Sequence, residues 1–326
     1  MSNKCPRIVI TDCDHPSVEI EKTILFEIDP GLILANCNTE DEVIEAAKDA
    51  DGIINQYAPI TRRVIESLKR CKVIARYGVG VDNIDVEAAT EHKIIVANVP
   101  DYCIDEVSTN TMALILACAR GITLLDRKIR DKKWDFTLAK PLFRTQGKTL
   151  GIFGLGRIGK MVAQKALGFD FKIIAYDPYV SKANLGVKLV ELSQLLTDSD
   201  FISIHAPLTI ETRHSFRKNE LKAMKKTAYL INTARGSIVD EKALYEALSK
   251  KWIAGAALDV MEKEPPDWEN LLPKLDNLIV TPHISFYSEE SYVELKTKVA
   301  ESVRSVLKGE LPRAMVNPQV IKRKIP

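Results

Sequence analysis

The feature that most constrains the fold is an alternation of short, β-branched apolar runs with amphipathic stretches, which the chain goes through twice. The first round contains the strand-like runs RIVIT (7–11), GIIN (52–55), KVIAR (72–76) and KIIVAN (93–98). The second round starts at 149 and contains TLGIFG, KIIAYD, FISIHA, AYLINTA, AGAALD and NLIVTP. Strands that are buried on both faces read as continuous apolar runs, so each round predicts a parallel sheet covered by helices.

We therefore expect an α/β fold with two doubly wound parallel-sheet domains, since 326 residues exceed one ordinary core. An apolar helix is expected around 107–120, and a long helix over 288–309 has no strand after it. We expect this long helix to return to the first domain. Residues 1–100 and 290–326 would then form one discontinuous domain and residues 101–289 the other, with a hinge and a cleft between them.

The composition is that of a soluble globular protein, with 46% hydrophobic and 28% charged residues. A formal net charge of +2 argues against a large nucleic-acid surface. No apolar run approaches the roughly 18 residues of a membrane span, and the N-terminus lacks the apolar core of a signal peptide. The six cysteines form no Cys-x-x-Cys pair, so they read as free thiols. We expect a cytoplasmic protein without a metal site and without a membrane or nucleic-acid partner.

A glycine motif, Gly154-x-Gly156-x-x-Gly159, follows a strand-like run and precedes a helical pattern. Such glycines allow a tight turn, the approach of a pyrophosphate to the backbone and close packing of the helix on the sheet. The next strand ends at Asp177, 18 residues after Gly159, where a carboxylate can accept hydrogen bonds from ribose hydroxyls. Because Pro178 and not Arg follows it, the pattern favours NAD (as NADH) over NADP. The alternative is an ordinary turn between a strand and a helix in a nucleotide-free domain.

Three later strand-like runs end beside residues suited to chemistry, namely Arg235, Glu264 and His283. Taken singly, each has an ordinary interpretation as a surface cation, a solvated acid or a loop histidine. Ligands of doubly wound sheets gather at the carboxyl ends of strands, so we expect the three to form one set. A guanidinium can hold the carboxylate of a 2-keto acid and polarise its carbonyl. An imidazolium can donate the proton, and a carboxylate beside it fixes the ring. The set predicts reversible hydride transfer between NADH and C2 of a small 2-keto acid.

The motifs GLGRIG, NTARGSIVDEKAL, GAALDV, EKEPP, TPHISFYSEES and RYGVGVDNIDVEAA resemble those of the D-isomer-specific 2-hydroxyacid dehydrogenases over nearly the whole chain. The resemblance implies a Rossmann NAD-binding domain inserted into a split, flavodoxin-like substrate domain. It also implies a homodimer formed through the NAD-binding domain and a small 2-keto or 2-hydroxy acid as substrate. The catalytic residues of the family fall on Arg235, Glu264 and His283.

The resemblance also implies individual contacts with the cofactor and the substrate. The carboxamide of the nicotinamide would meet Asp259, and the substrate carboxylate would meet the backbone N–H groups of Val79 and Gly80, with Arg235 and His283 beside it. Further cofactor contacts would come from Arg157, Ile158, His205, Ala206, Pro207, Thr212, Thr233, Ala234, Arg235 and His283.

Within the family, NVPDYCIDEV and HISFYSEES look most like the branch of the C-terminal binding proteins. This likeness makes Tyr57, Arg76 and Phe286 pocket residues, and Val107 stands where some members have a cofactor-binding Thr. Arg76 could instead pair with Asp82 or Asp85, and Phe286 could belong to the core. Two other functions stay open on the same scaffold. One is an NADH-sensing, corepressor-like dimer, and the other is a formate- or phosphite-type dehydrogenase.

Overall fold

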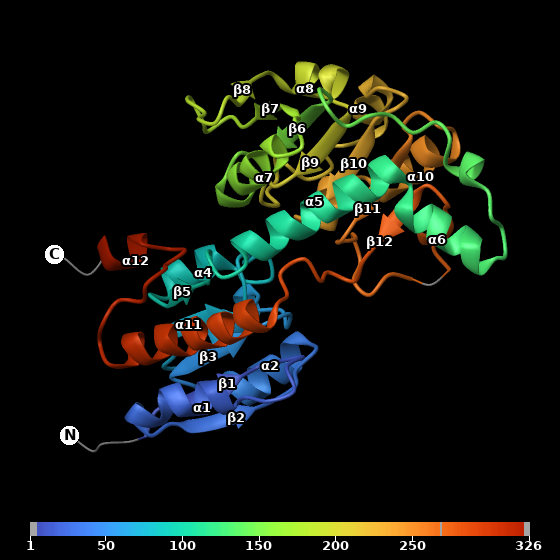
Figure 1. Ribbon diagram of the computed structural model, residues 1–326. Coiled ribbons are helices and arrows are strands. Elements are labelled where there is room, and N and C mark those ends of the chain that lie inside the picture. Colours follow the sequence, from blue (N-terminus) through green and yellow to red (C-terminus); the bar gives the residue numbers. More distant parts are fainter. Residues whose placement is uncertain (1–4, 268, 323–326) are drawn as a thin grey trace. The chain divides into compact units, whose positions relative to one another are not determined.

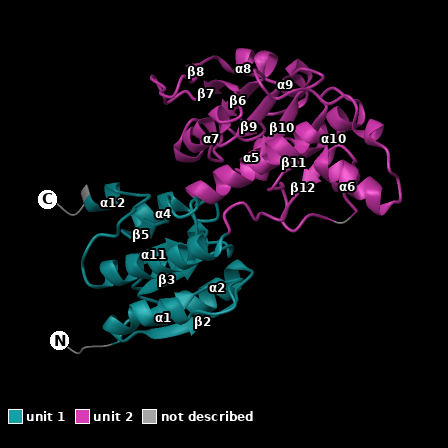
Figure 2. Ribbon diagram, in the orientation of Figure 1, with its two compact units in different colours: residues 1–103, 288–326 teal, residues 104–287 magenta. Residues whose placement is uncertain are grey.

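The computed structural model describes residues 5–267 and 269–322 of the chain. It divides into two compact units (Figure 2). Unit 1 comprises Met1–Cys103 and Ser288–Pro326, and unit 2 comprises Ile104–Tyr287. The boundaries expected from the sequence, 100/101 and 289/290, lie beside these.

Unit 1 is built on a five-stranded parallel sheet with the order β2-β1-β3-β4-β5 (Figure 1). This is the flavodoxin-like order of a doubly wound fold. The strands are β1 (Arg7–Ile10), β2 (Gly31–Leu34), β3 (Gly52–Asn55), β4 (Val73–Arg76) and β5 (Ile95–Ala97). The helices are α1 (Glu19–Leu25), α2 (Glu40–Ala47), α3 (Arg62–Ser67), α4 (Val86–Glu91), α11 (Glu289–Leu307) and α12 (Gln319–Lys322).

The last long helix of the chain, α11, completes unit 1. It packs against α1 and against β3 and β4. Lys296 on α11 is 2% exposed and lies 3.4 Å from the buried carboxylate of Glu21 on α1. The same carboxylate accepts a hydrogen bond of 2.6 Å from the hydroxyl of Tyr77. Because buried charges are stable only when they are paired, this cluster ties the two ends of the chain together.

Unit 2 is built on a seven-stranded parallel sheet with the order β12-β11-β10-β9-β6-β7-β8. Read from β6, this is the Rossmann order with one added strand. The strands are β6 (Thr149–Phe153), β7 (Lys172–Tyr176), β8 (Lys188–Leu189), β9 (Phe201–Ile204), β10 (Tyr229–Asn232), β11 (Gly255–Leu258) and β12 (Leu278–Val280). The expected α/β class and the two doubly wound parallel sheets are confirmed.

Helices cover both faces of the unit 2 sheet. One core contains side chains of α5 (Ile104–Arg120) and α7 (Arg157–Leu167), and the other contains side chains of α8 (Leu192–Asp198), α9 (Lys218–Ala223) and α10 (Glu241–Ser249). Neighbouring residues of one strand serve different cores, as Leu230 and Ile231 do on β10. Burial on both faces explains why these strands read as continuous apolar runs.

Every strand-like run predicted from the sequence is a strand, and two further strands were not predicted. The first, β2, lies at the edge of its sheet, and three of its four residues are exposed. The second, β8, is only two residues long and is also an edge strand. Edge strands of this kind are short and half-solvated, so they carry little of the apolar signal that marks a central strand.

All six cysteines are free thiols. Among the described residues, no three His, Cys, Asp or Glu side chains are grouped in a way that could hold a metal ion. Within the same residues, no single helix is long and apolar enough to cross a membrane. The pair of α5 and α6 (Ile122–Arg130) passes that test only together, across a bend of 64°.

Candidate active site

The glycine turn of unit 2 connects β6 to α7. Gly154 has φ +95°, which favours glycine, and a Cβ on it would lie 2.6 Å from the backbone nitrogen of Ala206. A Cβ on Gly159 would lie 2.3 Å from the carbonyl oxygen of Gly154, so only glycine lets α7 pack this close to the turn. By contrast, a Cβ on Gly156 would meet nothing within 4 Å. The space beside Gly156, next to the first N–H groups of α7, therefore fits a phosphate.

The carboxylate of Asp177 lies directly beside this turn, after β7. It accepts hydrogen bonds from the backbone N–H groups of Leu155 (2.8 Å) and Tyr179 (2.9 Å). A carboxylate oxygen can accept more than one hydrogen bond, so these contacts orient Asp177 and still leave it able to bind ribose hydroxyls. Arg157 and Ile158 form the first turn of α7 on the other side of the space.

The loop after β9 brings further predicted residues to the turn. His205 donates its backbone N–H to Phe153 (2.7 Å), and its Nε2 lies 2.8 Å from the hydroxyl of Ser203. Burial lowers the pKa of His205 to about 3, so its ring is neutral at physiological pH. Farther along the loop, the hydroxyl of Thr212 donates to the carbonyl of Pro207 (2.6 Å) and fixes the turn between them.

Arg235 lies at the carboxyl end of β10. The side chain of Asn232, the last residue of that strand, donates to the carbonyl of Arg235 (2.8 Å) and accepts from the N–H of Ala234 (3.0 Å). The backbone at Gly236 lies against the loop after β11, because a Cβ there would be 1.9 Å from the carbonyl carbon of Met261. Only glycine allows this approach, which brings Arg235 next to the loop that carries Glu264.

His283 and Glu264 form a direct pair. His283 Nδ1 lies 2.6 Å from Glu264 Oε2, and the other oxygen, Oε1, accepts the backbone N–H of Met261 (2.8 Å). Their side chains are 31% and 35% exposed, so a ligand can reach them. Since Nδ1 is engaged with the carboxylate, Nε2 is the ring nitrogen placed for proton exchange with a substrate. The three residues follow β10, β11 and β12 in the chain. These three strands are neighbours in the sheet (Figure 1).

Asp259 organises the loop that carries His283. Its side chain is 1% exposed and accepts hydrogen bonds from the hydroxyl of Thr281 (2.5 Å) and from the N–H groups of Ile284 (3.0 Å) and Ser285 (2.8 Å). The backbone carbonyl of Asp259 accepts a hydrogen bond from the N–H of His283 (2.7 Å), and the backbone of His283 has φ +53°. A buried carboxylate is stable only when donors surround it, and here the loop itself supplies them.

The predicted pocket residues of the other unit lie at the carboxyl edge of its sheet. Tyr57 follows β3 and is 53% exposed, whereas Arg76 is the half-buried last residue of the neighbouring strand β4. Asp12 accepts hydrogen bonds from the N–H groups of Tyr57 (2.5 Å) and Ala58 (3.1 Å) and so fixes the turn that presents the tyrosine.

Arg76 and Phe286 each have an alternative interpretation as structural residues. Asp85 caps α4 and lies 3.8 Å from Arg62. Phe286 is half-buried, and its ring centroid lies 6.3 Å from that of His283. Pairing of Arg76 with Asp82 stays a hypothesis.

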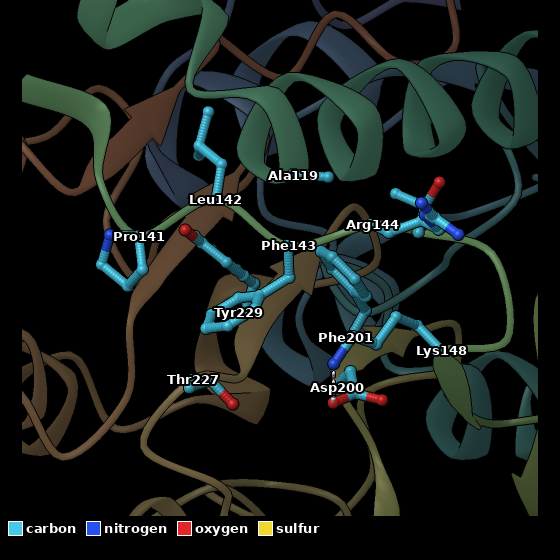
Figure 3. Close-up of a pocket in the computed structure, with 11 residues that line it drawn as sticks. Ala119, Pro141, Leu142, Phe143, Arg144, Lys148, Asp200, Phe201, Thr227 and Tyr229 are labelled. Carbon is cyan, nitrogen blue, oxygen red and sulfur yellow. Dashed lines mark hydrogen bonds and ion pairs between the residues drawn. The ribbon is translucent and has the colours of Figure 1, made fainter. Parts of the chain in front are cut away.

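The pocket in Figure 3 lies elsewhere. It is lined by Asp200, Phe201 and Tyr229 at the amino ends of β9 and β10, under Leu142 and Phe143. This is the edge of the sheet opposite to the one that carries the predicted residues, none of which lines the pocket. The candidate site is therefore the carboxyl edge, where the hydrogen-bonded acid and base lie.

Several residues that build the site were not predicted. Gly236 and Asn232 shape the Arg235 turn, and Thr281 anchors the loop of His283. Two side chains of α5, Asn110 and Thr111, contact Ser285 and Thr233. The segment NTARG already carried a signal, because an Asn before a turn and a Gly after the Arg are typical of a constrained loop.

Comparison with known proteins supports the same assignment. Residues 112–285 match the model of the D-isomer specific 2-hydroxyacid dehydrogenase, NAD binding domain. A D-3-phosphoglycerate dehydrogenase of Methanocaldococcus jannaschii is 44% identical over 95% of this chain, but the chain spans only 59% of its length. A glyoxylate reductase of Korarchaeum cryptofilum is 40% identical over 87% of this chain and 88% of its own length.

Among solved structures, a D-lactate dehydrogenase from Aquifex aeolicus in complex with NAD and lactic acid has a TM-score of 0.86 at 29% identity. The match covers 95% of this chain and 99% of that one. The narrower likeness to the C-terminal binding proteins stays a prediction. The motifs, the two sheet orders and these relatives agree, and the chain belongs to the D-isomer specific 2-hydroxyacid dehydrogenases, a family of oxidoreductases, with the NAD-binding domain in residues 112–285.

Proposed function

We propose that the protein catalyses the reversible, NAD-dependent reduction of a small 2-keto acid to a D-2-hydroxy acid. The observation that carries the proposal is the 2.6 Å contact between His283 Nδ1 and Glu264 Oε2, on strands adjacent to the one that ends at Arg235. An acid–base pair and a guanidinium at one edge of an NAD-binding sheet are the groups that ketone reduction needs. The relatives named glyoxylate reductase and D-lactate dehydrogenase act on acids of this class.

Each catalytic side chain has one task. Bound NADH supplies the hydride. Arg235 holds the substrate carboxylate and polarises the carbonyl with its planar donor fork. His283 donates a proton from Nε2 to the carbonyl oxygen during reduction and accepts it back during oxidation. Glu264 keeps the ring oriented and stabilises the imidazolium state, as a carboxylate does beside a catalytic histidine.

The cofactor would be held by residues that already form a cradle. The open space beside Gly156 would take the pyrophosphate, next to Arg157 and Ile158, and the carboxylate of Asp177 would accept hydrogen bonds from the adenosine ribose. A carboxylate repels a 2′-phosphate, so we infer a preference for NAD over NADP. The segment from His205 to Pro207, Thr212, Thr233 and Ala234 would line the remainder, with Asp259 near the carboxamide.

The residues of unit 1 are proposed to bind the substrate. The N–H groups of Val79 and Gly80 would hold its carboxylate. The carbonyl of Val79 accepts a hydrogen bond of 2.6 Å from the side chain of Asn98, which fixes this part of the loop. Tyr57 and Arg76, together with Phe286 of unit 2, would set which side chain of the keto acid fits.

We also propose a homodimer formed through unit 2. The segment 122–143 exposes six large apolar side chains, which is unusual for a surface that stays in water. They are Ile122, Ile129, Trp134 (92% exposed), Phe136 (73%), Leu138 and Phe143. A second copy of the chain is the commonest partner of such a surface in soluble enzymes. The free thiols support a reducing, cytoplasmic location.

The test of the activity is the loss of NADH absorbance with purified protein and a panel of keto acids. Pyruvate, hydroxypyruvate, glyoxylate and 2-keto-4-methylthiobutyrate cover the expected range of side chains. The product should be the D-isomer. NADH binding without reduction of any of these acids would contradict the proposal. Turnover of formate or phosphite, or capture of a protein partner that depends on NADH, would then point to the other two functions.

The matched variant is His283→Asn. It should lower kcat by roughly 10²- to 10⁴-fold, the usual contribution of a general acid, with little change in NADH affinity. If NADH affinity were lost instead, His283 would be a structural residue and its catalytic role would have to be abandoned.

A further inference from the structure

The first helix of unit 2, α5, makes two polar contacts with the loops that carry the proposed catalytic residues. Asn110 Nδ2 donates to Ser285 Oγ at 2.6 Å, and Thr111 Oγ1 lies 3.0 Å from Thr233 Oγ1. These two α5 residues are consecutive, yet they reach loops that follow different strands, β12 and β10. The remainder of the buried face of α5 is largely apolar.

The contact of Asn110 leads to His283 in two steps. Ser285 is 4% exposed, accepts from Asn110 at its hydroxyl and donates its backbone N–H to Asp259 at 2.8 Å. Asp259 in turn accepts the backbone N–H of His283 through its carbonyl, at 2.7 Å. His283 has φ +53°, a conformation that a non-glycine residue adopts only when its surroundings hold it there. The hydrogen bond from Asn110 to Ser285 therefore supports the loop that holds His283 in this strained backbone conformation.

The contact of Thr111 leads to Arg235. Thr111 is fully buried and Thr233 is 8% exposed, so their hydroxyls pair away from water. Thr233 lies between Asn232, which ends β10, and the Ala234–Arg235 turn. If the two hydroxyls moved apart, each would stay buried without a hydrogen-bond partner, which costs free energy. The pair therefore favours one position for the end of β10.

We propose that Asn110 and Thr111 are positioning residues for the two halves of the catalytic set. Asn110 keeps His283 aimed at the carbonyl oxygen, and Thr111 keeps Arg235 in place for the carboxylate. This inference rests on the proposed function. It predicts different kinetic effects for two neighbouring residues. Asn110 acts through the proton donor and should change kcat, whereas Thr111 acts through the group that also holds the carboxylate and should mainly raise KM.

The test of Asn110 compares two substitutions of similar shape. Asn110→Leu removes the hydrogen bond, whereas Asn110→Asp keeps a link because the Ser285 hydroxyl can donate to the carboxylate. For Asn110→Leu we expect kcat to fall roughly 3- to 10-fold, the usual effect of one hydrogen bond, with KM and NADH affinity within about 2-fold. Asn110→Asp should recover most of kcat. Ala113→Ser, a change at an exposed position of the same helix, is the control, because the nearer Thr109 accepts a hydrogen bond from Lys165 and is not a neutral site.

A second readout does not depend on activity. Hydrogen–deuterium exchange of the peptide that covers 281–287 should speed up in Asn110→Leu, because the N–H groups of Ile284 and Ser285 lose support. It should stay at the wild-type rate in Asn110→Asp and Ala113→Ser. For Thr111→Val, KM for the keto acid should rise about 3-fold or more, with a smaller change in kcat.

The outcomes separate the two proposals. If wild-type protein reduces no keto acid, the proposed function fails, and the exchange data alone decide whether Asn110 holds the loop. If the wild type is active, the inference is overturned when Asn110→Leu leaves either kcat or the exchange of 281–287 unchanged. It is also overturned when Thr111→Val and Asn110→Leu alter kcat and KM in the same proportions, because α5 would then be only a scaffold.

Discussion

The sharpest prediction concerns Gly236, where a single methyl group should misalign the catalytic set. A Cβ at this position would lie 1.9 Å from the carbonyl carbon of Met261, 2.1 Å from its oxygen and 2.4 Å from the nitrogen of Glu262. Non-bonded atoms do not approach a Cβ closer than 3.0 Å, so in Gly236→Ala the two loops must separate by about 1 Å.

The displaced loop is the one that holds Glu264. The N–H of Met261 donates to Glu264 Oε1, and Oε2 orients His283, so the shift carries the acid–base pair away from Arg235. A misplacement of about 1 Å can lower the rate about 10²-fold. We therefore expect kcat of Gly236→Ala to fall by about 10²-fold, with a loss of about 1–3 kcal/mol in unfolding free energy from overpacking.

The assay is steady-state reduction of the best keto acid, together with NADH titration and urea unfolding. Residues 1–103 and 288–326 contain no tryptophan, whereas Trp134 and Trp252 belong to unit 2, so tryptophan fluorescence reports the unfolding of the unit that contains Gly236. Gly168→Ala is the matched control in the same unit, because a Cβ there would meet only the carbonyl oxygen of Lys165, at an ordinary contact distance of 3.4 Å. A folded Gly236→Ala protein with wild-type kcat would refute the reasoning.

Three further predictions concern the cofactor, pH and assembly. Asp177→Ala should bring the kcat/KM values for NADPH and NADH closer together, and an unchanged ratio would remove Asp177 from the ribose site. In the folded protein the pKa of His205 is about 3, well below its unfolded value. As pH falls from about 7.5 to about 5, the unfolded chain therefore binds a proton at His205, whereas the folded protein does not. The free energy of unfolding should fall by up to roughly 2 kcal/mol from this group. His205→Asn should lose that much less in urea unfolding, and equal acid losses in both proteins would contradict the assignment. Phe136→Asp should convert the dimer to a monomer in sedimentation experiments, whereas a wild-type monomer would refute the proposed interface.

Much of the fold could be predicted because burial on both faces leaves a clear trace in the sequence. Runs such as FISI and GAAL are buried throughout, and their Phe, Ile, Ala and Leu side chains each belong to one core or the other. Gly154, Asp177, Arg235, Glu264 and His283 could be predicted because each follows such a run at a strand end. Local sequence also predicted the long helix α11 and its beginning near Ser288.

The support of the site could not be read in the same way. Asn110 and Ser285 are separated by 175 positions, and nothing near either residue marks the other as its partner. Glycine is required at 236 only because another loop passes close to it. The role of Asp259 likewise depends on three hydrogen-bond donors that follow a later strand, β12. Such contacts are products of tertiary packing, and one sequence carries no trace of which distant residues meet.

The discontinuous build of unit 1 has a consequence for biosynthesis. While the ribosome is still making residue 287, every part of unit 2 already exists, but the first 103 residues lack the helix that covers β3 and β4 and supplies Lys296 to Glu21. Domains usually mature in the order of translation, from the N-terminus onward. Here the order is reversed, because the sheet of unit 1 stays partly uncovered until α11 (Glu289–Leu307) has been synthesised. During that interval the apolar residues that α11 later covers are exposed to solvent, so this face of the sheet is a site where a chaperone would bind.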